Sequence, residues 1–280
     1  MRVWIHRYTL VPRRRLSSVA NEGAREGALI RVEDGFADIH PWPELGDAPL
    51  DEQLALLARD ELTPITRASL QFAKLDADAR RRGVSLFEGL TIPLSHWPGP
   101  NPPPEFDTVK LKSITEIPDH VRLRIDFNNT LTPSQFLEIA QTLPRDRVDF
   151  IEDPCPYDES LWRSLFDQTG LTLAYDGPPT ANRQPPTILI HKPATSPTFP
   201  THNNVVVTSY MDHPIGQYFA AYVAATHRTN PRCGLFTHVL YEPNAFIERV
   251  RVDGARLLSP GGTGIGFDDL LENLPWTSIG

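Results

Sequence analysis

The sequence predicts an α/β protein, a modified (β/α)-barrel that lacks several outer helices and is preceded by an N-terminal α+β capping domain. Two observations lead to this fold. Eight short apolar runs follow one another between residues 85 and 241, and several are nearly continuous in Val, Ile and Leu, as in parallel strands that are covered on both faces. Only three helical segments separate them, because the other intervals are too short and proline-rich for a helix with its turns.

Residues 1–85 are predicted to form the capping domain. The pieces VWIHRYTLV, GALIRV and GFADIH, separated by turn signals, predict a small antiparallel sheet. Apolar positions at helical spacing then predict helices over 51–62 and 63–83. The second helix has Thr63 as its N-cap, Pro64 in its first turn and Gly83 as its stop.

Residues 86–280 are predicted to form the barrel domain, with a C-terminal tail that is free to return to the cap. The predicted strands cover 85–95, 107–113, 120–128, 147–154, 171–177, 187–193, 204–211 and 233–241. Helices are predicted over 132–143, 158–168 and 214–228. Extended segments replace helices in the intervals 96–106, 114–119, 178–186 and 194–203.

Composition and charge favour small-molecule partners. The chain has 27 basic and 35 acidic side chains and a net charge of −8, which argues against nucleic acid and membrane surfaces as partners. No apolar run approaches the roughly 18 residues of a membrane span, and the N-terminus lacks the apolar core of a signal peptide. Cys155 and Cys233 are too few for a disulfide framework. We therefore expect a cytoplasmic protein, and the sequence sets no oligomeric state.

Polar residues stand at the C-terminal ends of the central predicted strands. Because alternate residues of a strand share a face, Lys110 points with Lys112, and Asp126 with Asn128. In a barrel these ends meet at one mouth, where catalytic residues are found. The set is Lys110, Lys112, Asp126, Asn128, Glu152, Asp153, Asp176 and Lys192.

Three carboxylates from successive strands, Asp126, Glu152 and Asp176, predict an all-oxygen metal site. Such a donor set suits Mg²⁺ or Mn²⁺ and is poorly suited to Zn²⁺. Nearby positive charge and burial both favour the neutral form of a lysine, so a lysine beside this site is a plausible general base.

The order KxK, D-x-N, IEDP, YDG and KP resembles the enolase superfamily, in its muconate-lactonizing-enzyme subgroup. The closest likeness is to the o-succinylbenzoate synthase family. The stretches REGALIRVEDGFADIHPWPELGD and TPITRASLQFAKLDAD are similar to that family's capping domain, and VVVTSYMDHPIGQYFAAYVAA to its seventh barrel strand and following helix. The resemblance covers most of the chain.

The resemblance implies roles for single residues. The metal ligands fall on Asp126, Glu152 and Asp176, and the base that removes the α-proton on Lys112. Lys110 supports the base and Lys192 faces the substrate from the opposite side. Asp153 is expected to be a supporting or turn residue. Asn128 and Ser209 are expected to contact the substrate.

The reaction that the resemblance implies is an Mg²⁺-dependent dehydration in menaquinone biosynthesis. It would convert 2-succinyl-6-hydroxy-2,4-cyclohexadiene-1-carboxylate to 2-succinylbenzoate through a metal-stabilised enediolate. The alternatives are an N-acylamino acid racemase, a dipeptide epimerase or a muconate cycloisomerase with the same metal and lysines, or a non-catalytic barrel. The stretch 233-CGLFTHVLYEPN-244 lacks the D-x-D of dipeptide epimerases, and a non-catalytic barrel would not require both Lys112 and Lys192.

Overall fold

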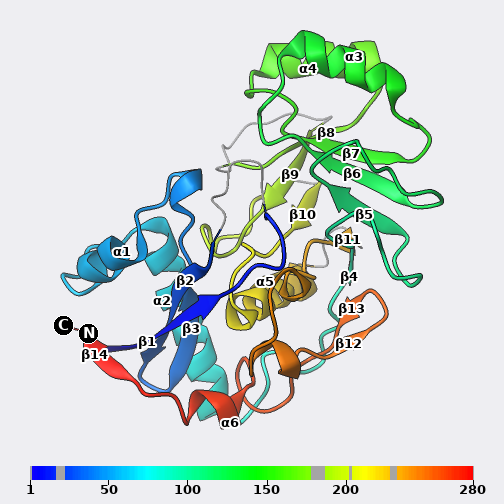
Figure 1. The fold of residues 1–280 in the computed structure, drawn as a ribbon. Helices are drawn as coiled ribbons and strands as arrows, with labels where there is room; N and C mark the ends of the chain where they lie inside the picture. The colour runs from blue at the N-terminus through cyan, green and yellow to red at the C-terminus, as the bar shows by residue number, and fades with distance from the viewer. Residues whose placement is uncertain (1, 17–22, 178–186, 202–203, 228–231, 280) are drawn as a thin grey trace.

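The computed structural model describes residues 2–16, 23–177, 187–201, 204–227 and 232–279, and it consists of a capping sheet with two helices packed beside a barrel (Figure 1). None of the helices in this described part of the chain combines the length and the apolar character that a membrane span requires.

The cap is an antiparallel sheet in the order β14-β1-β2-β3. Its strands are β1 (Val3–Leu10), β2 (Arg25–Val32), β3 (Gly35–Ile39) and β14 (Thr277–Ile279), so both ends of the chain meet in one sheet. Two helices accompany it, α1 (Leu50–Leu57) and α2 (Pro64–Arg81), with a short 3₁₀ helix over Pro43–Leu45. The predicted antiparallel cap sheet is therefore confirmed.

The predicted ends of α2 are confirmed in detail. The Thr63 hydroxyl accepts a hydrogen bond from the backbone N–H of Thr66 (3.2 Å), and the Thr66 hydroxyl accepts one from the N–H of Thr63 (2.9 Å). This reciprocal pair satisfies two N–H groups that a helix start leaves free. At the other end Gly83 has φ 67°, a conformation that glycine adopts without strain.

The barrel is a closed ring of eight parallel strands. Six of them form a sheet in chain order: β5 (Thr108–Leu111), β6 (Arg122–Asp126), β7 (Val148–Glu152), β8 (Leu173–Tyr175), β9 (Thr187–His191) and β10 (Val205–Val207). The ring is completed by β4 (Leu94–Ser95) and β11 (Arg232–Cys233), which pair with each other in parallel. Single bridges from Trp97 to Val109 and from Thr208 to Gly234 join them to β5 and β10.

Two predicted strands are much too long. In the run 85–95 only Leu94–Ser95 is a strand, because residues 85–90 form turns, with Gly89 at φ 71°. In the run 233–241 the strand ends at Cys233, and His238–Leu240 is a 3₁₀ helix. A hairpin of β12 (Val252–Asp253) and β13 (Arg256–Leu257) adds to β4, and Ile247–Arg249 (3₁₀) and α6 (Asp268–Leu271) complete the C-terminal segment.

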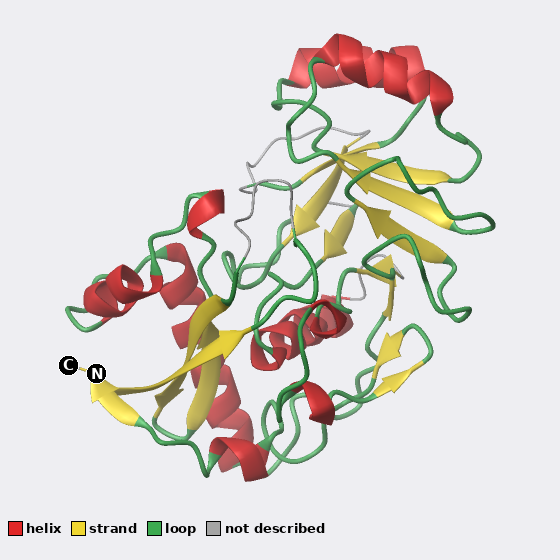
Figure 2. Cartoon of the chain, in the orientation of Figure 1, coloured by secondary structure: helices red, strands yellow, loops and turns green. Residues whose placement is uncertain are grey.

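Three helices cover the barrel, as predicted: α3 (Pro133–Thr142), α4 (Glu159–Thr169) and α5 (Pro214–His227). Figure 2 shows α3 and α4 together on the side of the barrel away from the cap. In the described residues the intervals 96–106, 114–119 and 194–201 contain no helix. The predicted extended segment 178–186 lies outside the described residues.

Strand alternation separates the inside of the barrel from its outside. Phe150, Ala174, Ile190 and Val206, from four adjacent strands, form a separate buried cluster in the barrel interior. The residues of opposite parity, such as Ile125 and Ile151, pack under α3 and α4 instead. The polar ends of the strands therefore stand above an apolar floor.

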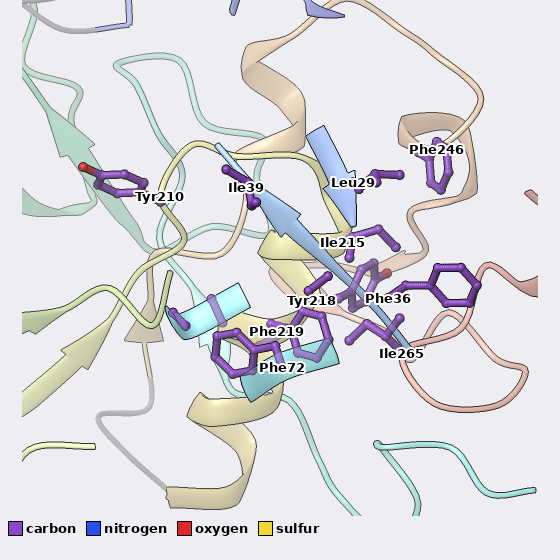
Figure 3. Packing of buried hydrophobic residues seen from close by; sticks show 14 of the residues in the cluster. Leu29, Phe36, Ile39, Phe72, Tyr210, Ile215, Tyr218, Phe219, Phe246 and Ile265 are labelled. Carbon is purple, nitrogen blue, oxygen red and sulfur yellow. The ribbon is translucent and has the colours of Figure 1, made fainter. Parts of the chain in front are cut away.

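The cap is fixed to the barrel through α5. Phe72 of α2 stacks on Phe219 of α5 with ring centroids 4.6 Å apart, and Figure 3 shows them beside Tyr218, with Ile215 and Ile39 nearby. One continuous apolar core includes the cap sheet, α5 and the C-terminal segment. Because this core crosses residue 85, the division into domains 1–85 and 86–280 stays a prediction.

Candidate active site

The predicted polar residues meet around a cavity of about 310 Å³ at the C-terminal ends of the barrel strands. Leu45, in the 3₁₀ helix of the cap, and Arg14 and Leu16, which follow β1, form part of its wall. Most of the predicted site residues line it: Lys110, Lys112, Asp126, Asn128, Asp176, Lys192 and Ser209.

Asp126 and Glu152 are held side by side by the strand register. They are the last residues of β6 and β7 and are direct partners in the parallel ladder. Lys110 from β5 bridges them, with its Nζ atom 2.6 Å from Glu152 Oε1 and 3.1 Å from Asp126 Oδ2. Burial raises the pKa of Glu152 to about 7 against the opposing effect of Lys110. Burial also acts to raise the pKa of Asp126, but Lys110 and Lys112 outweigh it and the pKa is lowered.

The two lysines that the sequence assigns to chemistry differ in their surroundings. Burial, the largest effect, lowers the pKa of Lys112, and its Nζ atom is 3.8 Å from Asp126 Oδ2. Burial acts in the same direction on Lys192, but Asp176, to which its ammonium group is hydrogen-bonded, raises the pKa overall. The pKa of Lys110 is raised as well, because Asp126 and Glu152 outweigh its burial. Of these three lysines, only Lys112 is displaced toward the neutral form that a base requires.

Asp153 is hydrogen-bonded to the chain that follows β8. Its carboxylate Oδ1 accepts a hydrogen bond from the backbone N–H of Asp176 (3.2 Å), which fixes the residue after β8. Its side chain is buried, and burial, with Asp176 and Glu152, raises its pKa to about 8. Asp153 has φ 42°, so the chain leaves β7 through a left-handed residue before Pro154.

The three carboxylates fit a hard divalent cation. They present only oxygen donors, and Glu152 Oε2 is buried without a hydrogen-bond partner, as expected of an atom that awaits a ligand. Among the residues that the structure describes, no three Asp, Glu, His or Cys side chains already gather around one point for a metal. The ammonium groups of Lys110 and Lys192 lie against the carboxylates instead.

The two predicted substrate contacts lie at the cavity wall. Asn128 has φ 49°, and its backbone N–H donates to Asp126 Oδ1 (3.0 Å). The Ser209 hydroxyl lies 2.6 Å from the Thr237 hydroxyl. Asn128 and Ser209 therefore each form a hydrogen bond within the protein as well as lining the cavity.

Sequence reasoning missed two buried polar residues at the site, His96 and Arg124. His96 lines the cavity, and Arg124 lies beneath it with 1% of its surface exposed. The signal was present in HVRLRIDFN, because Arg124 precedes Asp126 by two residues and so shares its inward face.

Comparison with known proteins agrees with this geometry. The protein-family sequence model that describes the N-terminal domain of O-succinylbenzoate synthase matches residues 3–79. The o-succinylbenzoate synthase of Bdellovibrio bacteriovorus is 32% identical over 319 aligned positions, which cover 97% of this chain and 97% of that protein.

Solved structures show the same fold at low identity. A mandelate racemase/muconate lactonizing protein from Herpetosiphon aurantiacus gives a TM-score of 0.74 at 13% identity and covers 94% of this chain and 96% of that one. A dipeptide epimerase from Cytophaga hutchinsonii, solved with Mg and the dipeptide D-Ala-L-Val, gives 0.74 at 14% identity and covers 100% and 99%.

The capped barrel, together with these relatives, defines an enzyme of the enolase superfamily, in its muconate-lactonizing-enzyme subgroup. Within it, the chain belongs to the o-succinylbenzoate synthase family. The predicted fold, superfamily and enzyme class, a carbon–oxygen lyase, are confirmed.

Proposed function

We propose that this enzyme carries out the Mg²⁺-dependent dehydration of 2-succinyl-6-hydroxy-2,4-cyclohexadiene-1-carboxylate to 2-succinylbenzoate, a step of menaquinone biosynthesis. The observation that carries the proposal is that Lys112, Lys192, Asp126 and Asp176 line one cavity, with Glu152 joined to it through Lys110, in a chain of this family. A dehydration needs a base for the proton and a charged environment for the substrate carboxylate, and this cavity has groups for both.

The three carboxylates Asp126, Glu152 and Asp176 would hold the metal ion. When bound, the ion supplies positive charge beside the substrate carboxylate and so favours loss of the neighbouring proton. Mn²⁺ fits the same oxygen donors. Asp153 would keep Asp176 in place through the hydrogen bond to its backbone N–H.

Lys112 would act as the base. Its neutral amine takes the proton from the carbon that bears the carboxylate, and the electron pair of that C–H bond forms the new ring double bond as the C–O bond to the hydroxyl breaks. In a syn elimination the hydroxyl leaves on the face of Lys112, so the new ammonium group can return the proton and release water. Lys192, from β9, would lie toward the other face of the ring, where its positive charge interacts with the π system.

A racemase is the second candidate, and one observation favours it. Lys112 and Lys192 both reach the cavity, from β5 and β9, and racemisation requires an acid and a base on opposite faces of one carbon. The two activities use the same residues, so a measurement must separate them by substrate.

An ultraviolet assay with the purified enzyme tests the proposal. With Mg²⁺ present, the diene absorbance of the cyclohexadiene carboxylate should disappear as 2-succinylbenzoate forms. A chelator should stop this loss, and added Mg²⁺ should restore it. An enzyme that racemises N-acylamino acids but does not turn over the diene under the same conditions would contradict the proposed dehydration. That result would support the second candidate.

A further inference from the structure

His96 is a buried cavity residue to which the proposed mechanism gives no role. It directly follows β4 and lines the cavity with Lys110 and Lys112. Its backbone N–H donates to the carbonyl oxygen of Cys233 (2.9 Å), which ties it to β11. Only 4% of its surface is exposed, so the position of the ring is set by the protein around it.

Arg124 determines which ring nitrogen of His96 carries the proton. Its Nη1 atom lies 3.0 Å from His96 Nδ1. A guanidinium group has donors and no acceptor, so the arginine donates and Nδ1 is the unprotonated acceptor. Burial lowers the pKa of His96 well below its usual value, and the charges of Arg124 and Lys110 lower it further. The ring is therefore neutral, with its proton on Nε2.

Arg124 is itself fixed in place. Its Nε donates to Asp149 Oδ2 (2.8 Å), and its Nη1 donates to the carbonyl oxygen of Arg232 (3.0 Å). The guanidinium carbon lies 4.7 Å from the centre of the Phe150 ring on the barrel floor. The tautomer of His96 is thus determined by the buried and rigidly held guanidinium group of Arg124, and not by contact with solvent.

The Nε2–H group of His96 is available to a ligand. In the described part of the chain the ring forms its hydrogen bond through Nδ1, and Nε2 is not among the buried polar atoms that lack a partner. The atom is thus open to the cavity. The ring packs closely against the chain that follows β11, where a Cβ atom at Gly234 would lie only 3.0 Å from His96 Cε1.

The place of His96 in the ring of strands indicates which part of a substrate it meets. The three carboxylates stand on β6, β7 and just after β8, and the proposed base just after β5, whereas His96 stands just after β4, which lies between β5 and β11. A substrate whose carboxylate is held at β6–β8 therefore presents another group to His96. That side of the cavity contains an N–H donor backed by Arg124 and close to Lys110, so it accepts an oxygen and repels an ammonium group.

We propose that His96 is a substrate-binding and specificity residue whose Nε2–H donates a hydrogen bond to an oxygen of the substrate's succinyl arm. This inference rests on the proposed function and deepens it. It gives a physical reason why the cavity favours a substrate with an oxygen-bearing arm over one with a free amino group at the same place.

Binding measurements test this without turnover. Calorimetric titration with 2-succinylbenzoate in Mg²⁺ should show that His96→Leu lowers affinity by about 10- to 100-fold, since a hydrogen bond to a charged or strongly polar group is lost. The affinity for benzoate, which lacks the succinyl arm, should differ by less than about threefold between His96→Leu and the wild type. His96→Gln, which retains an N–H near the Nε2 position, should recover most of the loss. His6→Leu, on β1 outside the cavity, is the matched control.

Nitrogen-15 NMR of labelled histidine gives an independent readout in the wild type. Nδ1 should have the shift of an unprotonated nitrogen, and the Nε2 signal should move when 2-succinylbenzoate binds. A protonated Nδ1, or equal affinities of the wild type and a folded His96→Leu variant, would overturn the inference and leave the dehydratase proposal standing. Failure of the wild type to bind 2-succinylbenzoate at all would overturn both.

Discussion

Lys110 Nζ lies 2.6 Å from Glu152 Oε1, so this lysine places a positive charge directly beside a buried carboxylate. Lys110 also lies 3.1 Å from Asp126. Removal of one partner of a buried ion pair leaves an uncompensated charge and is strongly destabilising.

The first prediction concerns stability and metal removal. In chelator, Lys110→Met should lower the free energy of unfolding by about 3 kcal/mol, because Asp126 and Glu152 lose their counter-ion. Mg²⁺ should stabilise this variant more than the wild type, because the ion replaces the missing charge. Thermal unfolding with and without Mg²⁺ measures both effects, with Lys74→Met on the exposed face of α2 as control. Equal responses to Mg²⁺ in the variant and the wild type would contradict it.

The second prediction concerns pH. Asp212, after β10, is fully buried, its Oδ1 has no hydrogen-bond partner, and burial raises its pKa to about 7. Asp38 of β3 faces it across Gly216, and Tyr8 and Tyr241 are close by. A carboxyl group with a raised pKa in the folded state stabilises the protein at low pH, and this contribution is lost as pH rises toward 7.

Asp212→Asn should therefore gain stability relative to the wild type as pH increases from about 5 to about 8, by at most about 3 kcal/mol. Denaturant unfolding at several pH values measures the difference between the two proteins. Asp253→Asn, at an exposed position of β12, should show no such trend. A difference that is constant with pH would show that Asp212 titrates normally.

The third prediction concerns the cap. Gly35 begins β3 at a point where α2 crosses so closely that a Cβ atom would overlap the carbonyl oxygen of Ala73. Gly35→Ala should lower the free energy of unfolding by about 1–3 kcal/mol or more, because the helix must move away from the sheet. Urea denaturation measures this loss. Unchanged stability would mean that α2 can move away from β3 at no cost in free energy.

The parts of the fold with local signals could be predicted from the sequence. Thr63, Pro64 and Gly83 mark the ends of α2 by short-range chemistry, and the acidic strand ends at Asp126 and Glu152 follow from the two-residue period of a strand. The lengths of β4 and β11 could not be predicted in this way, because each pairs mainly with strands far away in the chain.

The contacts within the site depend on distant parts of the chain. Arg124 is buried because Asp149 and the carbonyl of Arg232 receive its hydrogen bonds, and only the closed barrel brings these together. The pairing of Lys110 with Glu152 likewise depends on the register of three strands. The residue types of the site could be predicted from the sequence, whereas the hydrogen-bond and ion-pair partners of Arg124 and Lys110 could be identified only from the structure.

The dehydration rate of Lys112→Ala tests the central claim most directly. With the cyclohexadiene carboxylate and saturating Mg²⁺, kcat should fall by about 10²- to 10⁴-fold, the usual contribution of a general base, and binding of 2-succinylbenzoate should persist. Lys74→Ala should keep the wild-type rate. A folded Lys112→Ala enzyme with kcat within a few fold of the wild type would contradict the assignment of Lys112 as the base.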